Sequence, residues 1–360
     1  MEDRAREYAR IKYRLAIIDI AYTLLLLFIL QASGINLALK SIFFRFTSCE
    51  FAHVALYSVT LFAVYSILTL YPDFYRSFVI ERKFNLSNQK ISAWFFDYLK
   101  GNLLSLAFFV VLIECLFFFV QNYPSSWWWM GAVFWVFLSV VIARIFPIMV
   151  IPLFFKYKKI QDDGLRKAVL ALAGKMGVKV LDIFEIDFSS KSLKANAAFV
   201  GIGKSKRVLL TDTLLGGRFG QKEIEVIMAH EFAHYRFRHL LKMIALSALS
   251  VFFAFYIFSL LGKSGLDARD IANLGSFLLL FMLFQIALTP LINWIHRAME
   301  RNADIAAIKA TGDKGAFISM MDKLAEQNLS ERKPPLWAKI FFYDHPPIEE
   351  RIKVAKNLEI

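Results

Sequence analysis

The chain has 360 residues, of which 58% are apolar and 20% are charged, and its formal net charge is +13. A water-soluble fold of this length could not bury so much apolar surface, so the composition argues against a soluble globule. The basic residues are concentrated between apolar blocks, and no basic face interleaved with aromatic residues is present. This distribution is typical of loops beside anionic lipid, so we expect membrane lipids, and no nucleic acid, as partners.

Six apolar blocks are long enough to cross a bilayer, whose hydrocarbon core requires about 20 mainly apolar residues in a helix. They cover residues 15–30, 54–70, 103–120, 128–154, 240–261 and 274–295. The first block follows a charged N-terminal segment and lacks a small-residue cleavage site, so we interpret it as a retained span. Charged residues within the blocks are expected to face protein or water, because unpaired charge is costly in lipid. Asp19, Glu114 and Arg144 are such residues.

The distribution of Lys and Arg among the loops predicts the orientation of the spans. Basic residues are frequent before the first block, between the second and third, and in the segments 156–239 and 296–360. In contrast, residues 121–127 carry no charge, and residues 262–273 are nearly neutral. We therefore expect both termini and both long polar segments on the cytoplasmic side, with the chain in the cell membrane.

The polar segment 156–239 carries signals of a small α+β domain. A helix is expected over residues 163–176, ending at Gly177. Strands are expected over residues 180–186, 197–202 and 207–211, with a hairpin-like turn at residues 201–204. A further helix is expected to begin near Gln221 and to continue without a break into the fifth span.

The motif His230-Glu231-Phe232-Ala233-His234 in this last helix fits the pattern H-E-x-x-H. Residues four apart share one face of a helix, so both imidazoles can bind one zinc ion. The intervening Glu231 then lies near a water at the metal and can act as a general base. The metzincin pattern requires Gly and His at the positions that Phe237 and Leu240 occupy, so that class is excluded.

A carboxylate from a later segment can complete the set of ligands. Glu300 and Asp304, in the run ERNAD, are four residues apart and share a helical face. Glu300 is the predicted third ligand, and Asp304 is predicted to accept a hydrogen bond from the back of a ligand histidine. Two other stretches complete the predicted site. Residues 194–201 have the pattern of an edge strand that can pair with an extended peptide, and His345 and Arg351 can stabilise an oxyanion.

Several of these stretches together resemble the integral-membrane CAAX prenyl endopeptidases, gluzincins whose zinc site opens into a large intramembrane chamber. In the order of that family, they are FVIERKFN at 78–85, PIMVIPLFFKY at 147–157, Asn196-Ala197, RVLLTDTL at 207–214, HEFAH at 230–234 with His239, ERNAD at 300–304 and HPPIEER at 345–351. The resemblance covers most of the chain. It implies a multi-helical membrane protein that cleaves a peptide or protein substrate, which in eukaryotic members is lipidated.

The resemblance also implies a role for each matching residue. His230, His234 and Glu300 match the ligands of a single zinc ion, and Glu231 matches the base. Asp304 matches a residue that supports a ligand, while Asn196, followed by Ala197, matches the contact to the substrate backbone. His345 and Arg351 match the positions that support the transition state and the ligands. Eukaryotic members have seven spans and this sequence predicts six, so the additional span would fall near residues 40–51.

The sequence thus predicts a mainly α polytopic fold of four consecutive parts. They are an N-terminal four-span domain (1–155), a peptidase segment with HEFAH (156–239), a two-span hairpin (240–295) and a C-terminal peptidase segment (296–360). One alternative is a quality-control protease resembling the heat-shock membrane protease HtpX, which usually has fewer spans and lacks HPPIEER. Two others are a transporter or channel, which leaves HEFAH and ERNAD unexplained, and an inactive scaffold, against which the intact ligands and Glu231 argue.

Overall fold

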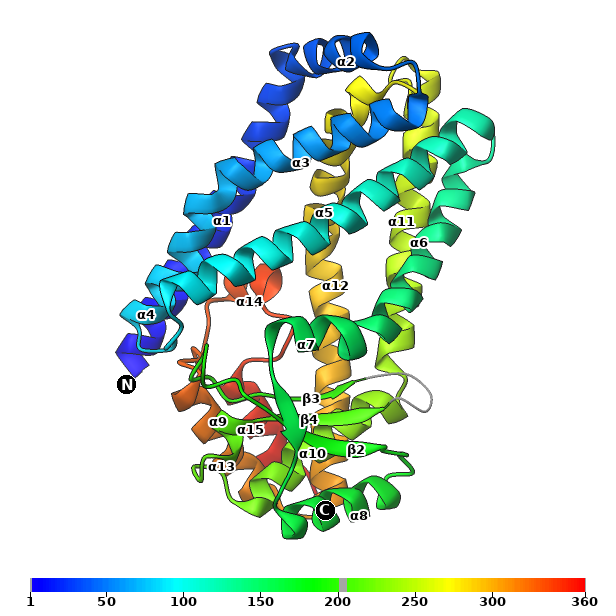
Figure 1. The fold of residues 1–360 in the computed structure, drawn as a ribbon. Helices are drawn as coiled ribbons and strands as arrows, with labels where there is room; N and C mark the ends of the chain where they lie inside the picture. The colour runs from blue at the N-terminus through cyan, green and yellow to red at the C-terminus, as the bar shows by residue number, and fades with distance from the viewer. Residues whose placement is uncertain (1, 201–205, 360) are drawn as a thin grey trace.

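The computed structural model describes residues 2–200 and 206–359. Long helices occupy one end of the molecule, and a sheet with shorter helices occupies the other end (Figure 1). Six helical segments within the described residues are long and apolar enough to cross a membrane: Glu2–Ala32, Glu50–Lys83, Ile91–Asn122, Trp127–Phe154, His239–Lys263 and Ile271–Thr311. Each contains one of the six predicted blocks, so the predicted mainly α polytopic fold is confirmed.

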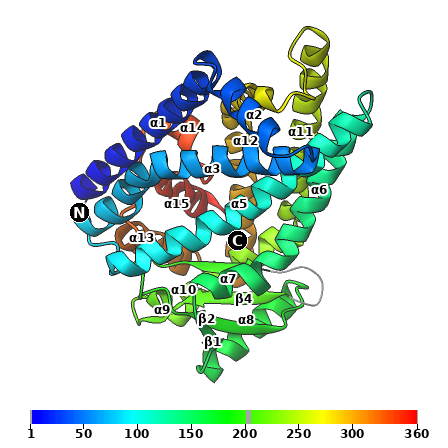
Figure 2. The same cartoon turned by 45° about the horizontal axis from the view of Figure 1, so that its top comes forward.

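The long helices surround α12 (Leu274–Thr311), which runs from the far end of the molecule down to the sheet. α1 (Glu2–Ala32) lies on one side of α12, and α6 (Trp127–Ile145) and α11 (His239–Lys263) lie on the other. In the same views α3 (Glu50–Phe74) and α5 (Ile91–Asn122) run obliquely across α12 (Figures 1 and 2). Two π-helical turns, η1 (Tyr75–Val79) and η2 (Phe146–Val150), continue α3 and α6 into the short helices α4 (Ile80–Lys83) and α7 (Ile151–Phe154).

The helix α2 (Ile35–Phe46) lies between the first two spans and has 12 residues. At 1.5 Å per residue it is about 18 Å long, which is too short for a hydrocarbon core of about 30 Å. It packs on the connection between α11 and α12, because Asn36 donates a hydrogen bond to the Ala272 carbonyl (3.1 Å) and Lys40 pairs with Asp270 (2.8 Å). The connections after α1 and after α11 therefore lie at one end of the molecule, opposite the sheet.

The four-stranded sheet has the order β1-β2-β4-β3. Its strands are β1 (Tyr157–Lys159), β2 (Asp182–Ile186), β3 (Ala197–Val200) and β4 (Arg207–Thr211). β2 and β4 are parallel, whereas β1 and β3 pair antiparallel with their neighbours. The predicted strands are confirmed, and β3 lies at an edge as expected. β1 was not predicted, because three residues carry too little pattern, and the predicted turn at 201–204 lies outside the described residues.

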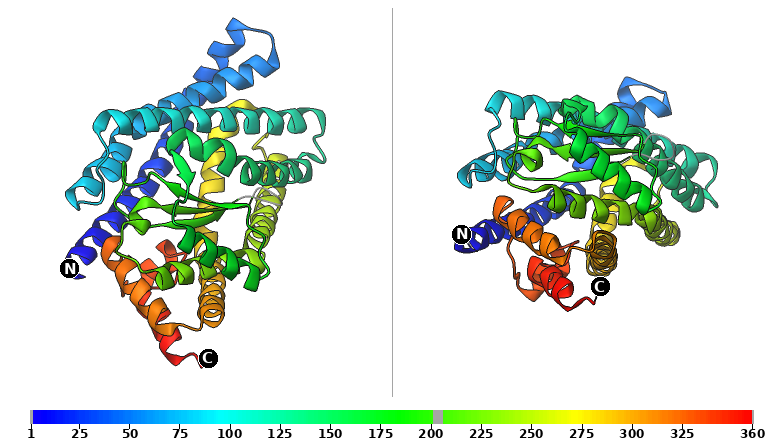
Figure 3. Two further views of the ribbon diagram at one scale, coloured as in Figure 1. Left: turned by 60° about the horizontal axis from the view of Figure 1, so that its bottom comes forward. Right: turned by 90° about the horizontal axis from the view of Figure 1, so that it is seen from below.

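The remaining helices include the C-terminal ones, which Figure 3 shows in orange and red and which pack mainly against other helices and not on the sheet. They are α8 (Asp163–Lys175), α9 (Asp212–Leu215), α10 (Gln221–Arg236), α13 (Lys314–Gln327), α14 (Leu336–Phe342) and α15 (Ile348–Asn357). Alanines fully hidden from solvent line the contact between α10 and α12: Ala229, Ala233, Ala303 and Ala307. Their small side chains let the two helices approach closely, which brings the HEFAH and ERNAD motifs together.

The prediction of one unbroken helix from Gln221 into the fifth span is wrong. α10 ends at Arg236, and α11 begins at His239. Between them Arg238 has φ 54° and ψ 38°, a left-handed conformation that is uncommon for residues other than glycine. This residue redirects the chain into the fifth span and returns His239 to the metal-binding motif.

Candidate metal centre and substrate cleft

The two histidines of α10 and the glutamate of α12 meet in one small group. The Nε2 atoms of His230 and His234 are 3.0 Å apart, because the residues are one helical turn apart on a single face. The two carboxylate oxygens of Glu300 face different histidines: Oε2 lies 3.2 Å from Nε2 of His230, and Oε1 lies 3.2 Å from Nε2 of His234. His230 and Glu300 are buried, with 8% and 6% of their surface exposed.

The geometry of this group fits a zinc ion. Zinc binds histidine nitrogen and carboxylate oxygen at about 2.0–2.1 Å, so tetrahedral ligand atoms are about 3.3 Å apart. The observed separations of 3.0 to 3.2 Å are close to this value. Among the described residues, the buried Oε2 of Glu300 accepts no hydrogen bond of normal geometry. A cation between the three side chains would satisfy this oxygen.

The electrostatic environment also favours a cation at this point. Burial lowers the pKa of His230, but the hydrogen bonds that its ring donates to the carboxylates of Asp304 and Glu300 outweigh burial and raise the pKa to about 9. Two carboxylates beside a buried imidazole stabilise positive charge there, whether a proton or a metal ion carries it. The set of two neutral histidines and one carboxylate is the donor set of many catalytic zinc sites.

Behind the ligands, Asp304 joins His230 to Arg351. Its Oδ1 lies 2.9 Å from Nδ1 of His230, on the side of the ring opposite the metal group. Arg351, from α15, donates from Nε (2.8 Å) and Nη2 (2.5 Å) to the two oxygens of the same carboxylate. Asp304 is 1% exposed, so this bidentate pair is shielded from water. Two of the donor groups of Arg351 are therefore engaged in holding Asp304.

His239 is a further residue of this region whose place the motif search did not predict. It is buried, and its Nδ1 lies 3.0 Å from Nδ1 of His234. The two ligand histidines thus have different supporting residues: Asp304 behind His230, and His239 behind His234. The signals in the sequence were a third histidine shortly after the motif and its place in the family resemblance. The break at Arg238 hides its proximity to His234 from any argument based on helical periodicity.

A cavity of about 160 Å³ opens beside the metal group. Its lining includes residues predicted for the site: Glu231, Asn196, Ala197, His345 and Arg351. Larger apolar side chains also line it: Leu214, Ile227, Met320, Met321 and Leu324. The structure therefore brings together, around one cleft, residues from β3, α10, α13, α15 and the loop before α15.

His345 approaches the metal group from the loop between α14 and α15. Its Nε2 lies 3.3 Å from Oε2 of Glu300, and its Nδ1 contacts Oδ1 of Asp344 at 2.8 Å. About half of its side chain, 53%, is exposed to solvent. A histidine in this place can donate a hydrogen bond to a group bound at the metal.

The edge strand reaches the cleft through Asn196. The backbone of Asn196 is tied to β4, because its N–H donates to Oγ1 of Thr211 (3.0 Å) and its carbonyl accepts from the same hydroxyl (2.9 Å). Its side-chain oxygen accepts a hydrogen bond from the Ala197 N–H (2.9 Å). β3 pairs with β4 on one side only within the described residues, so its other edge is available to an extended peptide.

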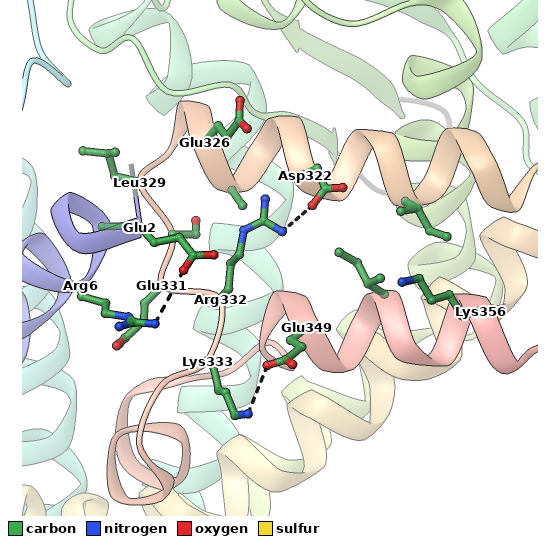
Figure 4. A pocket seen from close by; sticks show the side chains of 15 residues that line it. Glu2, Arg6, Asp322, Glu326, Leu329, Glu331, Arg332, Lys333, Glu349 and Lys356 are labelled. Atoms are coloured by element: carbon green, nitrogen blue, oxygen red, sulfur yellow. Dashed lines mark hydrogen bonds and ion pairs between the residues drawn. The ribbon is translucent and has the colours of Figure 1, made fainter.

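A larger cavity, of about 600 Å³, lies elsewhere, between the N-terminus of α1, α13 and α15 (Figure 4). Six of its charged side chains pair with one another: Arg332 with Asp322, Lys333 with Glu349 and Arg6 with Glu2. None of the three groups His230, His234 and Glu300 lines it. Cavity size therefore does not identify the functional site here, whereas the convergence of metal-ligand side chains does.

Known proteins resemble the chain over nearly all of its length. The model of peptidase family M48 matches residues 159–359, and that of the CAAX prenyl protease N-terminal region, described as five membrane helices, matches residues 2–156. An uncharacterized metalloprotease, YhfN, of Bacillus subtilis is 28% identical over 99% of this chain and 85% of its own length. CAAX prenyl protease 1 of Saccharomyces cerevisiae is 27% identical over 80% of this chain and 68% of its own length.

The crystal structure of S. mikatae Ste24p superimposes with a TM-score of 0.87 at 25% identity, covering 98% of this chain and 88% of the other. With these matches, the fold and the site define a membrane-embedded zinc metalloprotease. The chain belongs to peptidase family M48. Where the N-terminal family model has five membrane helices, the matched residues 2–156 contain four candidate spans and the short α2. The matches give no support to a transporter, a channel or a scaffold.

Proposed function

We propose that the chain is an endopeptidase that holds one zinc ion between His230, His234 and Glu300. The observation that supports this most strongly is the meeting of these three side chains beside a cleft that Glu231 lines. A zinc ion bound there would supply Lewis acidity toward the scissile carbonyl and lower the pKa of a nearby water.

The other residues of the site then have distinct tasks. Glu231 takes a proton from the attacking water and later delivers it to the leaving amine. His345 donates a hydrogen bond to the oxyanion as it develops. Asp304, held by Arg351, keeps the proton of His230 on Nδ1, so that the lone pair of Nε2 faces the metal. Arg351 thus acts mainly through Asp304, and less directly on the oxyanion than its place in the sequence had suggested.

The substrate is proposed to be an extended peptide that pairs with the free edge of β3, starting at Asn196 and Ala197. Main-chain hydrogen bonds along a strand give affinity with modest sequence preference. Several relatives are CAAX prenyl proteases by name, and the apolar spans would accept an isoprenyl tail. They would equally accept a hydrophobic peptide or an unfolded membrane segment, so we propose that lipidation assists cleavage without being required for it.

One comparison tests the function and the substrate together. A peptide is assayed with and without a farnesyl group, in the same liposomes, with the wild-type protein and with Glu231→Gln. Cleavage of both peptides by the wild type alone is the expected result. Cleavage of only the farnesylated peptide would establish strict CAAX processing, and cleavage of neither peptide by zinc-loaded protein would refute the endopeptidase proposal.

We also propose that both termini and the metal centre lie on the cytoplasmic side of the cell membrane, as the basic loops suggest. Cys49 follows α2, at the end of the molecule opposite the sheet, and is exposed. A membrane-impermeant maleimide added to intact cells should therefore label Cys49, and it should not label a cysteine introduced at Lys158 in a Cys49→Ser background. The opposite labelling pattern would reverse the proposed orientation.

A further inference from the structure

The segment of residues 191–196, which leads into the edge strand β3, is held from two sides. On the peptidase side, the side-chain amide of Asn328 accepts a hydrogen bond from the Ala195 N–H (2.9 Å) and donates one to the Ala195 carbonyl (3.1 Å). Gln327 donates to the Leu193 carbonyl (3.0 Å). The end of α13 thereby pairs with this segment as a neighbouring strand would.

On the other side, the segment is bound to the membrane domain. The Leu193 N–H donates to the carbonyl of Leu86 (2.9 Å), and the hydroxyl of Ser87 donates to the Lys191 carbonyl (2.7 Å). Lys191 also forms an ion pair with Asp97 of α5 (2.6 Å). The connection between α4 and α5 therefore lies against the segment along several residues, although about one hundred positions separate the two in the chain.

Glu81 of α4 is at the centre of this contact. One carboxylate oxygen pairs with Lys194 of the segment (2.8 Å), and the other accepts hydrogen bonds from Tyr8 (2.6 Å) and Lys12 (3.3 Å) of α1. Lys194 also donates to the Tyr8 hydroxyl (3.0 Å). The Glu81 side chain is only 13% exposed. A single carboxylate thus joins two membrane helices to the residue two positions before Asn196.

Apolar packing makes this contact rigid. Ile80, Phe84 and Leu86, which flank Glu81, are buried in one cluster with Tyr8 and Leu329. Leu329 directly follows Asn328, so the cluster also fixes the residue that holds Ala195 from the peptidase side. The FVIERKFN run has no role in the proposed chemistry. Its residues instead form the surface against which the segment entering β3 packs.

From these contacts we propose that Glu81, through Lys194, is a positioning residue that sets the place of the substrate-pairing strand relative to the metal centre. This inference rests on the proposed pairing of substrate with β3. The displacement of a reacting group by about 1 Å can cost about 100-fold in rate, so a strand that is free to shift would lower activity without any change at the zinc.

The test uses Glu81→Gln, which keeps the shape of the side chain and removes its charge. Lys83→Gln is the matched control, because Lys83 pairs with Glu7 of α1 from the same short helix, but both partners are exposed (55% and 57%) and neither contacts the segment. We expect Glu81→Gln to lower kcat/KM by about 10- to 100-fold for a long peptide that pairs along β3. A short peptide that ends before the strand should be affected much less, and the bound zinc should be unchanged.

A second measurement does not depend on activity. Amide hydrogen exchange of residues 191–200 should be faster in Glu81→Gln than in the wild type, and it should be normal in Lys83→Gln. Lys194→Gln approaches the same contact from the other side and serves if Glu81→Gln fails to fold. The double variant should be no worse than Glu81→Gln alone, because the Glu81–Lys194 interaction is already lost in that variant.

The possible outcomes separate this inference from the proposed function. The positioning role would be overturned if Glu81→Gln and Lys194→Gln behaved like Lys83→Gln, with the same amide exchange and the same dependence of activity on peptide length. An equal loss for long and short peptides would also overturn it, since a general loss of folded enzyme affects both. A wild-type protein that cleaves no peptide would refute the proposed function, while the exchange measurement would still decide whether Glu81 orders the segment.

Discussion

Charged side chains are withdrawn from water in both halves of the molecule, but their surroundings differ. Around the metal centre, His230, Glu300 and Asp304 are each less than 10% exposed, and each faces partners from another element. Within the spans, Asp19 and Arg76 pair at 2.7 Å but keep 31% and 39% of their side chains exposed. Catalysis requires fixed geometry, whereas a charge in a span requires only a partner or water.

This difference predicts which substitutions should have large effects on zinc binding, activity or stability. At the metal centre, each polar group is oriented by a neighbour that is itself buried, so the loss of one group disturbs the next. In the spans, an exposed pair can exchange its partner for water at little cost. We therefore expect effects to decrease from the metal ligands, through the groups that support them, to buried pairs remote from the metal.

The largest effect is expected for His234→Ala, which removes one of three metal ligands. The purified variant should contain little zinc, the wild type should contain one ion per chain, and peptide cleavage by the variant should be lost. Metal analysis of both proteins is the measurement. Glu114→Gln, in the third span, is the control from the other half of the molecule and should retain its zinc. Undiminished zinc in His234→Ala would show that the ligand assignment is wrong.

Glu231→Gln should separate metal binding from catalysis. The amide has nearly the shape of the carboxylate but cannot accept the proton of the attacking water, so zinc should remain while the rate falls by about 10²- to 10⁴-fold. Zinc content and turnover of the same preparation are compared. Near-normal turnover with zinc bound would remove Glu231 from the role of general base.

The three metal ligands also show how much of the site could be predicted from the sequence. The spacing of His230 and His234 follows from the helix period, so their shared face could be derived from five residues. Glu300 lies 70 positions from His230, on α12. It was predicted from the pairing of Glu and Asp four residues apart in ERNAD, and the resemblance to the family supported that prediction. Hydropathy located all six spans, because each block meets a length requirement that lipid imposes.

The contacts that could not be predicted depend on distant segments or on single backbone angles. Nothing in local pattern indicates that Arg238 adopts a positive φ, so the break before His239 was missed. The pairing of Glu81 with Lys194 joins residues more than one hundred positions apart, each in a polar stretch that would otherwise be assigned to solvent. Such contacts are decided by tertiary packing, which overrides local propensity.

A moderate effect is expected for Asp304→Asn. The amide keeps a partner for Arg351 but is a weaker acceptor for His230, so the ligand is held less well. Loss of a residue that supports a metal ligand typically costs about 10- to 100-fold in metal affinity. Chelator competition measures this affinity. Asp322→Asn, which disrupts the more exposed pair with Arg332, is the control and should leave zinc affinity unchanged. Equal affinities for the two variants would mean that Asp304 does not support the ligand.

The smallest effect is expected at Glu223, a buried residue at the start of α10 that lies away from the metal. Its carboxylate accepts hydrogen bonds from the Gly220 N–H (2.7 Å), the Ser319 hydroxyl (2.5 Å) and Lys323 (2.7 Å). Burial raises the pKa of Glu223, but these partners outweigh burial and leave the pKa below its ordinary value. The ionised form is therefore the one that stabilises the fold, by joining α10 to α13.

Because the folded pKa of Glu223 is depressed, this stabilisation is present above the pKa of the unfolded chain and is lost as pH falls through the folded pKa. Glu223→Gln should lower the free energy of unfolding by about 1–3 kcal/mol near neutral pH, with the difference from wild type shrinking in acid. Thermal unfolding in detergent across pH measures it. Glu225→Gln, whose partner Gln221 is exposed on the same helix, should change stability by less than about 0.5 kcal/mol. A Glu223→Gln difference that grew as pH fell would have the wrong sign and would refute the assignment of the ionised form.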